Sequence, residues 1–182
     1  MALGATAAAV CVPRTDKRRA ALIGAALGTL PDLDVLIRYA DPIDNFVKHR
    51  GFSHSLFVLF PFSLILWLIG KRISTRVRKA PYHWLAAIAF TLITHPLLNA
   101  HAVYGTQLLW PLNSPPVMWS TIFIIDPAYT LPLLMAFLAA LCAPQWKGIQ
   151  TALTLSILLS SSYLTWSWVA KSMVGDKVTE HI

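Results

Sequence analysis

Histidine, aspartate and asparagine residues occur where apolar runs of this chain begin or end. The set comprises Asp32, Asp34, His49, His54, His95 and Asn99. Carboxylate oxygen and imidazole nitrogen are common protein ligands of divalent cations, among which zinc and manganese fit these residue types best. The set therefore indicates a metal site, provided that the fold brings these distant positions together.

Two of the candidate ligands lie close together in TLPDLDVL, residues 29–36. In a helix, Asp32 and Asp34 would point about 200° apart, so both reach one ion only from a turn or an extended stretch. The alternative needs no metal, because Thr29 followed by Asp32 also resembles a helix N-cap with an acid in the first turn.

The stretch KHRGFSHS, residues 48–55, leads directly into the run LFVLFPFSLILWLIG. Gly51 permits a sharp bend between His49 and His54, after which a helix can start. Arg50 is suited to an anionic group such as phosphate. The alternative is a pair of interfacial histidines with Ser53 as helix cap and Arg50 as an anchor.

His95 and Asn99 are four residues apart, so they share one face of a predicted helix. His101 is six residues beyond His95 and does not share that face, so we treat it as secondary. Asp126 precedes Pro127, a pair typical of a helix start, and this explains Asp126 without a metal. A charged residue at mid-bilayer costs roughly 2.5–3.5 kcal/mol, so ionisable residues near apolar segments are candidates for function.

Composition identifies the class of protein. The chain has 182 residues, of which 56% are hydrophobic and 13% charged, and its mean hydropathy is +0.59. A soluble domain of this size would expose too much apolar surface. The net charge of +7 comes from short basic clusters between apolar runs, the pattern of membrane topology signals, so we do not expect nucleic-acid binding. Cys11 and Cys142 are far apart and form no zinc motif.

The apolar runs predict an all-α, polytopic membrane bundle of about four to six membrane-embedded helices. Four runs are long enough to approach the 17–25 residues that span a bilayer, namely 54–70, 83–100, 122–143 and 147–170. Two shorter runs, 2–12 and 20–30, predict a short first helix and a short or re-entrant second one. We expect one membrane domain over residues 1–172 and a flexible C-terminal tail over residues 173–182.

Loop charges predict the orientation of this bundle. Basic residues concentrate in the loops at 14–19, 71–79 and 147, which therefore face the cytoplasm by the positive-inside rule. The loops at 31–53 and 101–121 then face the other side. Every candidate ligand lies at the ends of segments next to these two loops, so the predicted site is extracytoplasmic.

Four motifs in this order resemble those of a known family. They are GTLPDLDVL, HRGFSHS, THPLLNAHAVYGTQLLWP and FIIDPAYTLPLL, within residues 20–143. The chain is thus similar to the YdjM-like proteins, described as LexA-binding, inner-membrane-associated hydrolases or as membrane-bound metal-dependent hydrolases. The resemblance implies a divalent metal, hydrolysis, and a site formed by Asp32, Asp34, His49, His54 and His95. Members of that family usually carry Asp where this chain has Asn99, so the site has one negative charge fewer.

The sequence and the resemblance lead to one main hypothesis and one alternative. The main hypothesis is a metal-dependent hydrolase of the bacterial inner membrane that acts on a phosphoester or lipid-linked substrate, with Asp32, His54 and Arg50 as catalytic residues. The alternative is a non-catalytic membrane protein, either a metal-bearing structural element or a protein-interaction module. Membrane lipids are the expected surroundings in both cases. A transporter is disfavoured, because the polar residues gather at one face and do not cross the bilayer.

Overall fold

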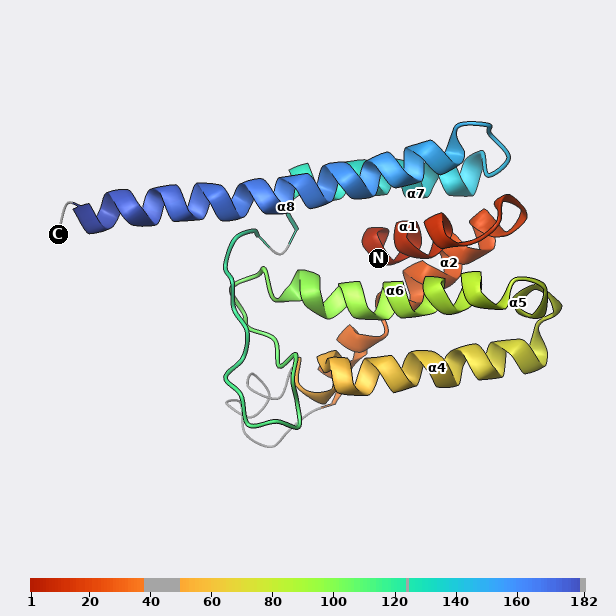
Figure 1. Cartoon of the computed structure of the whole chain (residues 1–182), viewed down its shortest axis with the longest axis horizontal. Coiled ribbons are helices and arrows are strands. Elements are labelled where there is room, and N and C mark those ends of the chain that lie inside the picture. Colours follow the sequence, from red (N-terminus) through yellow and green to blue (C-terminus); the bar gives the residue numbers. More distant parts are fainter. Residues whose placement is uncertain (38–49, 124, 181–182) are drawn as a thin grey trace.

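The computed structural model of the chain describes residues 1–37, 50–123 and 125–180 (Figure 1). In these parts the regular structure is helical, which confirms the predicted all-α class. The α-helices are α1 (Ala2–Cys11), α2 (Lys17–Leu27), α4 (Leu56–Ile73), α5 (Thr75–Lys79), α6 (Pro81–Asn99), α7 (Pro127–Cys142) and α8 (Ile149–Glu180). Short 3₁₀ helices lie at Arg14–Asp16, Pro31–Leu36 and Phe52–His54.

The first helix is the centre of the bundle. Although it has only 10 residues, α1 contacts α2, α6, α7 and α8. On one side α4 packs against α6, and on the other α8 packs against α7 (Figure 1). Small residues permit this arrangement, because a Cβ atom at Gly24 would lie 2.2 Å from the carbonyl oxygen of Gly4 and 2.5 Å from the Cβ of Ala8. Helices in membranes commonly associate through such small residues.

Two buried threonines join α1 to its neighbours. Thr6 donates a hydrogen bond of 3.1 Å to the carbonyl oxygen of Leu133 on α7, and Thr91 on α6 donates one of 3.1 Å to the carbonyl oxygen of Gly4. Both hydroxyl groups thus donate a hydrogen bond across a helix interface. No water molecule would take over either bond there if it were broken.

The basic connections all lie at one end of the bundle, on the right in Figure 1. Arg76 pairs with Asp16 at 2.8 Å, and Arg14 donates to the carbonyl oxygen of Trp146 at 3.0 Å. The buried ammonium group of Lys17 donates to the carbonyl oxygens of Ala9 and Val12 at the end of α1. The loop charges therefore share one face, as the sequence predicted.

One helix in the described part of the chain, α4, is long and apolar enough to cross a membrane. Only 11% of its 18 residues are buried inside the bundle. Its surface is therefore suited to contact with lipid rather than with a protein core. The apolar helices α1 and α7 are shorter, with 10 and 16 residues. The predicted count of four to six membrane-embedded helices is thus not confirmed and stays a prediction.

The last helix is longer than the apolar run that predicted it. The run at 147–170 corresponds to the beginning of α8, which continues to Glu180. Helical backbone therefore extends through most of the predicted tail at 173–182, and the flexibility of that tail stays a prediction.

Candidate metal centre

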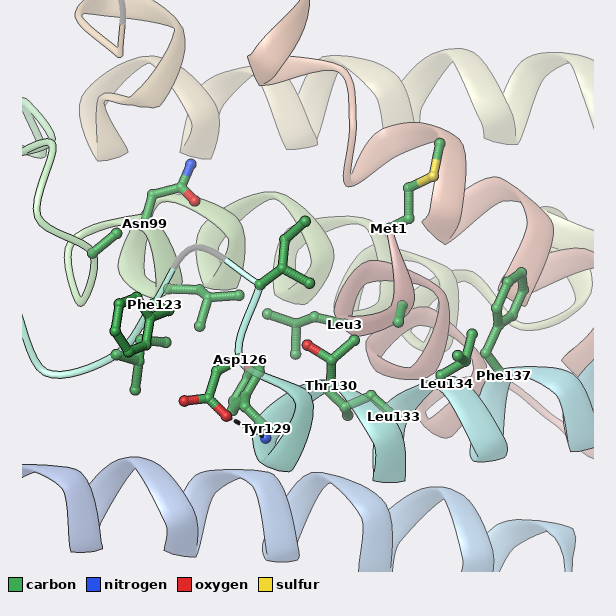
Figure 2. A pocket seen from close by; sticks show the side chains of 15 residues that line it. Met1, Leu3, Asn99, Phe123, Asp126, Tyr129, Thr130, Leu133, Leu134 and Phe137 are labelled. Carbon is green, nitrogen blue, oxygen red and sulfur yellow. Dashed lines mark hydrogen bonds between the residues drawn. The ribbon is translucent and has the colours of Figure 1, made fainter.

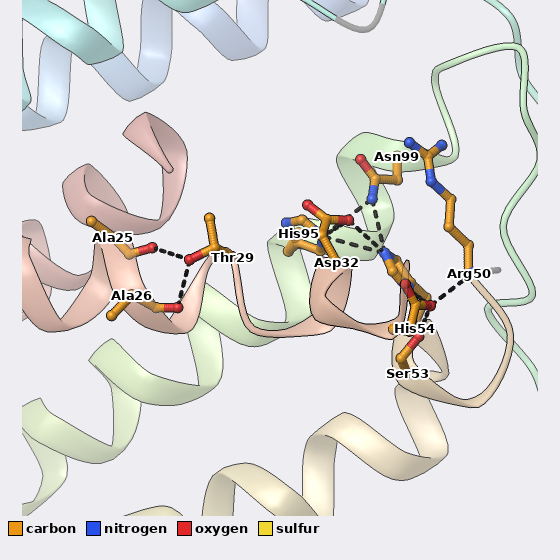
Figure 3. Close-up of polar contacts among 10 residues, drawn as sticks. Ala25, Ala26, Thr29, Asp32, Arg50, Ser53, His54, His95 and Asn99 are labelled. Atoms are coloured by element: carbon orange, nitrogen blue, oxygen red, sulfur yellow. Dashed lines mark hydrogen bonds and ion pairs between the residues drawn. The ribbon is translucent and has the colours of Figure 1, made fainter. Parts of the chain in front are cut away.

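The two aspartates lie on the turn that follows α2. Thr29 donates hydrogen bonds to the carbonyl oxygens of Ala25 and Ala26, so it caps the end of α2 rather than the start of a new helix (Figure 3). The 3₁₀ helix Pro31–Leu36 then carries both Asp32 and Asp34. The turn-like backbone agrees with the expectation from their spacing. The carboxylate of Asp32 faces Nε2 of His54, however, whereas that of Asp34 faces Nδ1.

His54 is positioned by the entry into α4. It ends the 3₁₀ helix Phe52–His54, and the next residue, Ser55, caps α4 by accepting a hydrogen bond from the amide of Phe57 at 3.2 Å. The alternative prediction of Ser53 as the helix cap is therefore wrong. The His54 side chain is fully buried.

The third element of the site is the final turn of α6. His95 and Asn99 lie on the same face of this helix, as their spacing of four residues predicted. The Asn99 side-chain nitrogen is 3.1 Å from Nε2 of His95 and 3.0 Å from Nε2 of His54. The amide is thus directed at the two imidazole rings (Figure 3).

Three ligand atoms from these elements form a nearly equilateral triangle. Asp32 Oδ1 is 3.3 Å from His54 Nε2 and 3.2 Å from His95 Nε2, and the two nitrogens are 3.3 Å apart. An ion bound tetrahedrally at about 2.0–2.1 Å, as zinc is by histidine, separates its ligand atoms by about 3.3–3.4 Å. The triangle therefore matches one face of a small four-coordinate ion, and these residues could hold one.

The chemistry of the donor set also fits a cation. His54 Nδ1 lies 2.9 Å from Ser53 Oγ, and Ser53 donates its hydroxyl proton to Asp34. In this arrangement Nδ1 of His54 carries the ring proton, and Nε2 presents a lone pair toward the carboxylate of Asp32. Two acceptors that face each other at 3.3 Å repel unless a positive centre lies between them.

Asp34 lies on the opposite side of the His54 ring from the triangle. Its Oδ2 is 3.7 Å from His54 Nδ1 and accepts hydrogen bonds from the Ser53 hydroxyl and from the Arg50 amide. This is the arrangement in which a carboxylate orients a metal-binding histidine through its second nitrogen. The sequence predicts Asp34 as a metal ligand. No pattern in the sequence distinguishes a carboxylate that binds the metal from one that orients a histidine.

Arg50 is buried beside the triangle. Its side chain is 9% exposed, and its Nε and Nη1 find no hydrogen-bond partner among the described residues. The guanidinium lies 5.6 Å from the ring centre of Tyr104. Its backbone has a φ of 61°, held by bonds from its amide to Asp34 at 3.0 Å and from the amide of Gln107 to its carbonyl at 3.1 Å. A guanidinium that is buried with free donors is suited to binding an anion.

Electrostatics keeps two of the ligands in the protonation state that binds metals. Burial lowers the pKa of the His54 imidazole, and the neighbouring Asp32 carboxylate opposes this only in part. For Asp32 itself burial would raise the pKa, but the adjacent imidazoles of His54 and His95 outweigh it, so its pKa lies below the usual range. At neutral pH the carboxylate is thus ionised and His54 is neutral.

Access to the triangle is one-sided. The side chain of His54 is fully buried and that of His95 is 12% exposed, whereas that of Asp32 is 46% exposed. A water molecule or a substrate can therefore reach the triangle from the side of Asp32.

Other candidates from the sequence lie elsewhere. His49 falls outside the described residues. His101 contacts the carbonyl oxygen of Leu97 through Nδ1 and packs edge-on against Trp119, away from the triangle. Asp126 accepts hydrogen bonds from the amides of Ala128 and Tyr129, so it caps α7 as Asp126-Pro127 predicted.

Comparison with known proteins identifies the family. The family model described as YdjM inner membrane protein matches residues 1–174. The chain belongs to the YdjM family of inner membrane proteins. This confirms the resemblance drawn from its motifs and agrees with the exposed apolar surface of α4.

One relative has a name that agrees with this assignment. The YdjM-family chain is 33% identical to the inner membrane protein YbcI of Escherichia coli (strain K12) over 91 residues. The match covers 48% of this chain and 51% of YbcI, so the chain spans about half the length of this relative. No solved structure matches the chain. These names give a location in the cell and name no reaction.

Proposed function

We propose that this protein is a metal-dependent hydrolase whose site lies at the extracytoplasmic face of the inner membrane and acts on phosphoesters. The observation that carries the proposal is the triangle of Asp32, His54 and His95, with ligand atoms 3.2–3.3 Å apart. Zinc or manganese is the cation we expect. A bound cation of this kind lowers the pKa of a coordinated water and polarises a phosphoryl oxygen.

The residues around the triangle have separate roles in this proposal. His54 and His95 hold the cation through Nε2, and Ser53 and Asp34 keep His54 in the required tautomer. Asp32 contributes Oδ1 to the triangle and is exposed on the open side. The same carboxylate is thus placed to accept a proton from an attacking water. Substrate approaches from this side.

Arg50 supports a phosphoester rather than a neutral substrate. A phosphoester offers anionic oxygens that a guanidinium can bind, and Nε and Nη1 of Arg50 have no hydrogen-bond partner among the described residues. A neutral ester would leave this buried positive charge unpaired, at a cost of several kcal/mol. The substrate we expect is therefore anionic.

The membrane arrangement belongs to the same proposal. We expect a multi-pass protein whose basic loops, tied together by Arg76–Asp16 and Arg14–Trp146, face the cytoplasm. The end of α6 and the entry into α4, which carry the two histidines of the triangle, lie at the opposite end of these helices (Figure 1). This depth corresponds to the headgroups of the outer leaflet of the inner membrane.

The position of Asn99 favours one alternative. Its amide lies 3.0 and 3.1 Å from the two histidine nitrogens, where a fourth ligand of a tetrahedral ion would sit. The amide oxygen and nitrogen can exchange places by a flip of the side chain. A site closed by Asn99 would be structural, because a catalytic site keeps one position open for water or substrate.

Metal content and hydrolysis together test the proposal. Elemental analysis of the purified wild type should give about one zinc or manganese per chain, and His54→Ala and His95→Ala should lose it. His101→Ala is the matched control and should keep it, because His101 lies outside the triangle. Phosphoester hydrolysis should follow metal content across the series. Stoichiometric metal without hydrolysis of any phosphoester would support the structural alternative, and full metal content in both alanine variants would contradict the site.

A further inference from the structure

A cavity of about 380 Å³ adjoins the metal triangle. It lies between the start of α1, the end of α6 and the first half of α7 (Figure 2). Asn99, whose amide contacts both histidines of the triangle, also lines this cavity. Its volume falls in the range of about 300–1,000 Å³ that is typical of ligand pockets.

The cavity follows α7 away from the triangle. Thr130, Leu134 and Phe137 line it and are spaced at i, i+4 and i+7, so they share one face of this helix. Seven residues of helix correspond to about 10 Å. Since α7 runs from the end of the bundle that carries the site toward the basic end, the cavity extends in the same direction (Figures 1 and 2). In the membrane arrangement proposed above, this direction leads from headgroup depth into the hydrocarbon layer.

The lining of this cavity is suited to hydrocarbon. The surface of the cavity is mostly apolar. Its one acidic residue, Asp126, is occupied by hydrogen bonds from the amides of Ala128 and Tyr129 and from the hydroxyl group of Tyr163. The acid is therefore not available to a polar ligand, whereas Leu133, Leu134 and Phe137 offer van der Waals contacts.

We propose that the substrate is a phosphate-bearing membrane lipid, whose phosphate lies at the triangle and Arg50 and whose hydrocarbon chain occupies the cavity along α7. This inference rests on the proposed function for the position of the phosphate. Charge complementarity supports it, because cationic groups bind the head at one end and apolar side chains receive the tail at the other. The direction of the cavity matches that of a lipid chain in the outer leaflet of the bilayer.

The test measures binding, so that it does not depend on turnover. Dodecyl phosphate, butyl phosphate and uncharged dodecanol are titrated into the detergent-solubilised protein, with and without manganese, and occupancy is read by native mass spectrometry. Thr130→Trp fills the cavity near the start of α7, and Leu134→Trp fills it one turn further on. Leu131→Trp is the matched control, because Leu131 lies on the same helix, is 55% exposed and does not line the cavity.

The wild type should bind dodecyl phosphate at least tenfold more tightly than dodecanol, and Arg50→Met should remove that preference. Either cavity-filling variant should weaken dodecyl phosphate at least fivefold and leave butyl phosphate within twofold, whereas Leu131→Trp should change neither. Equal binding of dodecanol and dodecyl phosphate would show an ordinary lipid-facing groove and overturn the inference. Unchanged dodecyl phosphate binding in both filled variants would also overturn it.

The two proposals fail in different ways. A protein that contains metal and hydrolyses phosphoesters without regard to chain length keeps the proposed function and loses the lipid substrate. A protein without metal or hydrolysis loses the proposed function, and the dodecyl phosphate titration then shows whether the cavity still selects a lipid phosphate.

Discussion

His54 connects the two halves of the site through its two ring nitrogens. Nε2 faces Asp32 and His95, whereas Nδ1 faces Ser53, which in turn bonds to Asp34. The first contact provides a ligand and the second fixes the tautomer that makes the ligand available. The ring is fully buried, so these contacts do not compete with bulk water.

Removal of the Ser53 hydroxyl should loosen this histidine. We expect Ser53→Ala to weaken metal affinity about 10–100-fold, the usual effect of losing a partner that orients a metal-binding histidine. Competition with a metal chelator measures the affinity. Nitrogen NMR of labelled histidine reports the tautomer directly, and a mixture of tautomers at His54 is expected only in the variant. An unchanged tautomer together with unchanged affinity would contradict the role assigned to Ser53.

At Asn99 a negative charge can be added to the site without enlarging the side chain. Asn99→Asp places a carboxylate 3.0–3.1 Å from the two histidine nitrogens, if it adopts the position of the amide. We expect metal affinity to rise at least tenfold, which corresponds to about 1.4 kcal/mol. Asn113→Asp, in the exposed loop after α6, controls for the change in net charge and should have no effect.

The rate of phosphoester hydrolysis in Asn99→Asp separates the two functional readings. A rate that rises with metal content marks an enzyme whose cation is held weakly. Tighter metal without hydrolysis favours the structural reading, and a loss of metal would contradict the placement of residue 99 in the site.

At the scale of helices, the close approach of α1 and α2 depends on the absence of side chains. Gly24→Ala would place a Cβ 2.2 Å from the carbonyl oxygen of Gly4, well inside van der Waals contact, so the two helices must separate. We expect a loss of about 1–3 kcal/mol, the usual effect of overpacking. Thermal unfolding in detergent measures it.

Gly175→Ala is the matched control for this substitution, because a Cβ at Gly175 meets no atom within 4 Å. Its unfolding temperature should equal that of the wild type or exceed it slightly, since alanine favours helix. Equal unfolding temperatures for Gly24→Ala and the wild type would show that α1 and α2 are not packed as described.

Helix positions followed from the sequence more fully than the geometry of the site. Runs of apolar residues predicted α4, α6, α7 and the beginning of α8 within a few residues, because length and hydropathy are local properties. The separate tasks of Asp32 and Asp34 could not be predicted in this way. Which carboxylate faces Nε2 of His54 depends on the turn after α2 and on the packing of that turn against the Phe52–His54 segment, which is a tertiary contact.

The site residues also differ in whether local sequence could pair them. His95 and Asn99 could be paired from their spacing, because a helix fixes which residues share a face. The association of Ser53 with Asp34 joins residues 19 positions apart through a bend at Gly51. No periodic pattern carries that information, and the sequence alone therefore predicted Ser53 as a possible helix cap and not as a partner of Asp34.

At the scale of the whole molecule, the orientation in the membrane follows from the basic end of the bundle. In a background of Cys11→Ala and Cys142→Ala, we expect Asn113→Cys to react with a membrane-impermeant maleimide in intact cells. Thr75→Cys, at the first residue of the basic helix α5, should react only after the membrane is opened. Both positions are exposed, so accessibility within the protein does not limit either reaction. The reverse pattern would place the triangle in the cytoplasm.

The central place of α1 has a consequence for the order in which the protein is made. This helix is synthesised before α6 and α7, yet it packs against both. Until both have been made, the carbonyl oxygen of Gly4 lacks Thr91, and the hydroxyl group of Thr6 lacks the carbonyl oxygen of Leu133, which are their partners in the finished bundle. Chaperones and the insertion machinery would therefore meet an incomplete bundle for most of translation, with the metal ligands still apart.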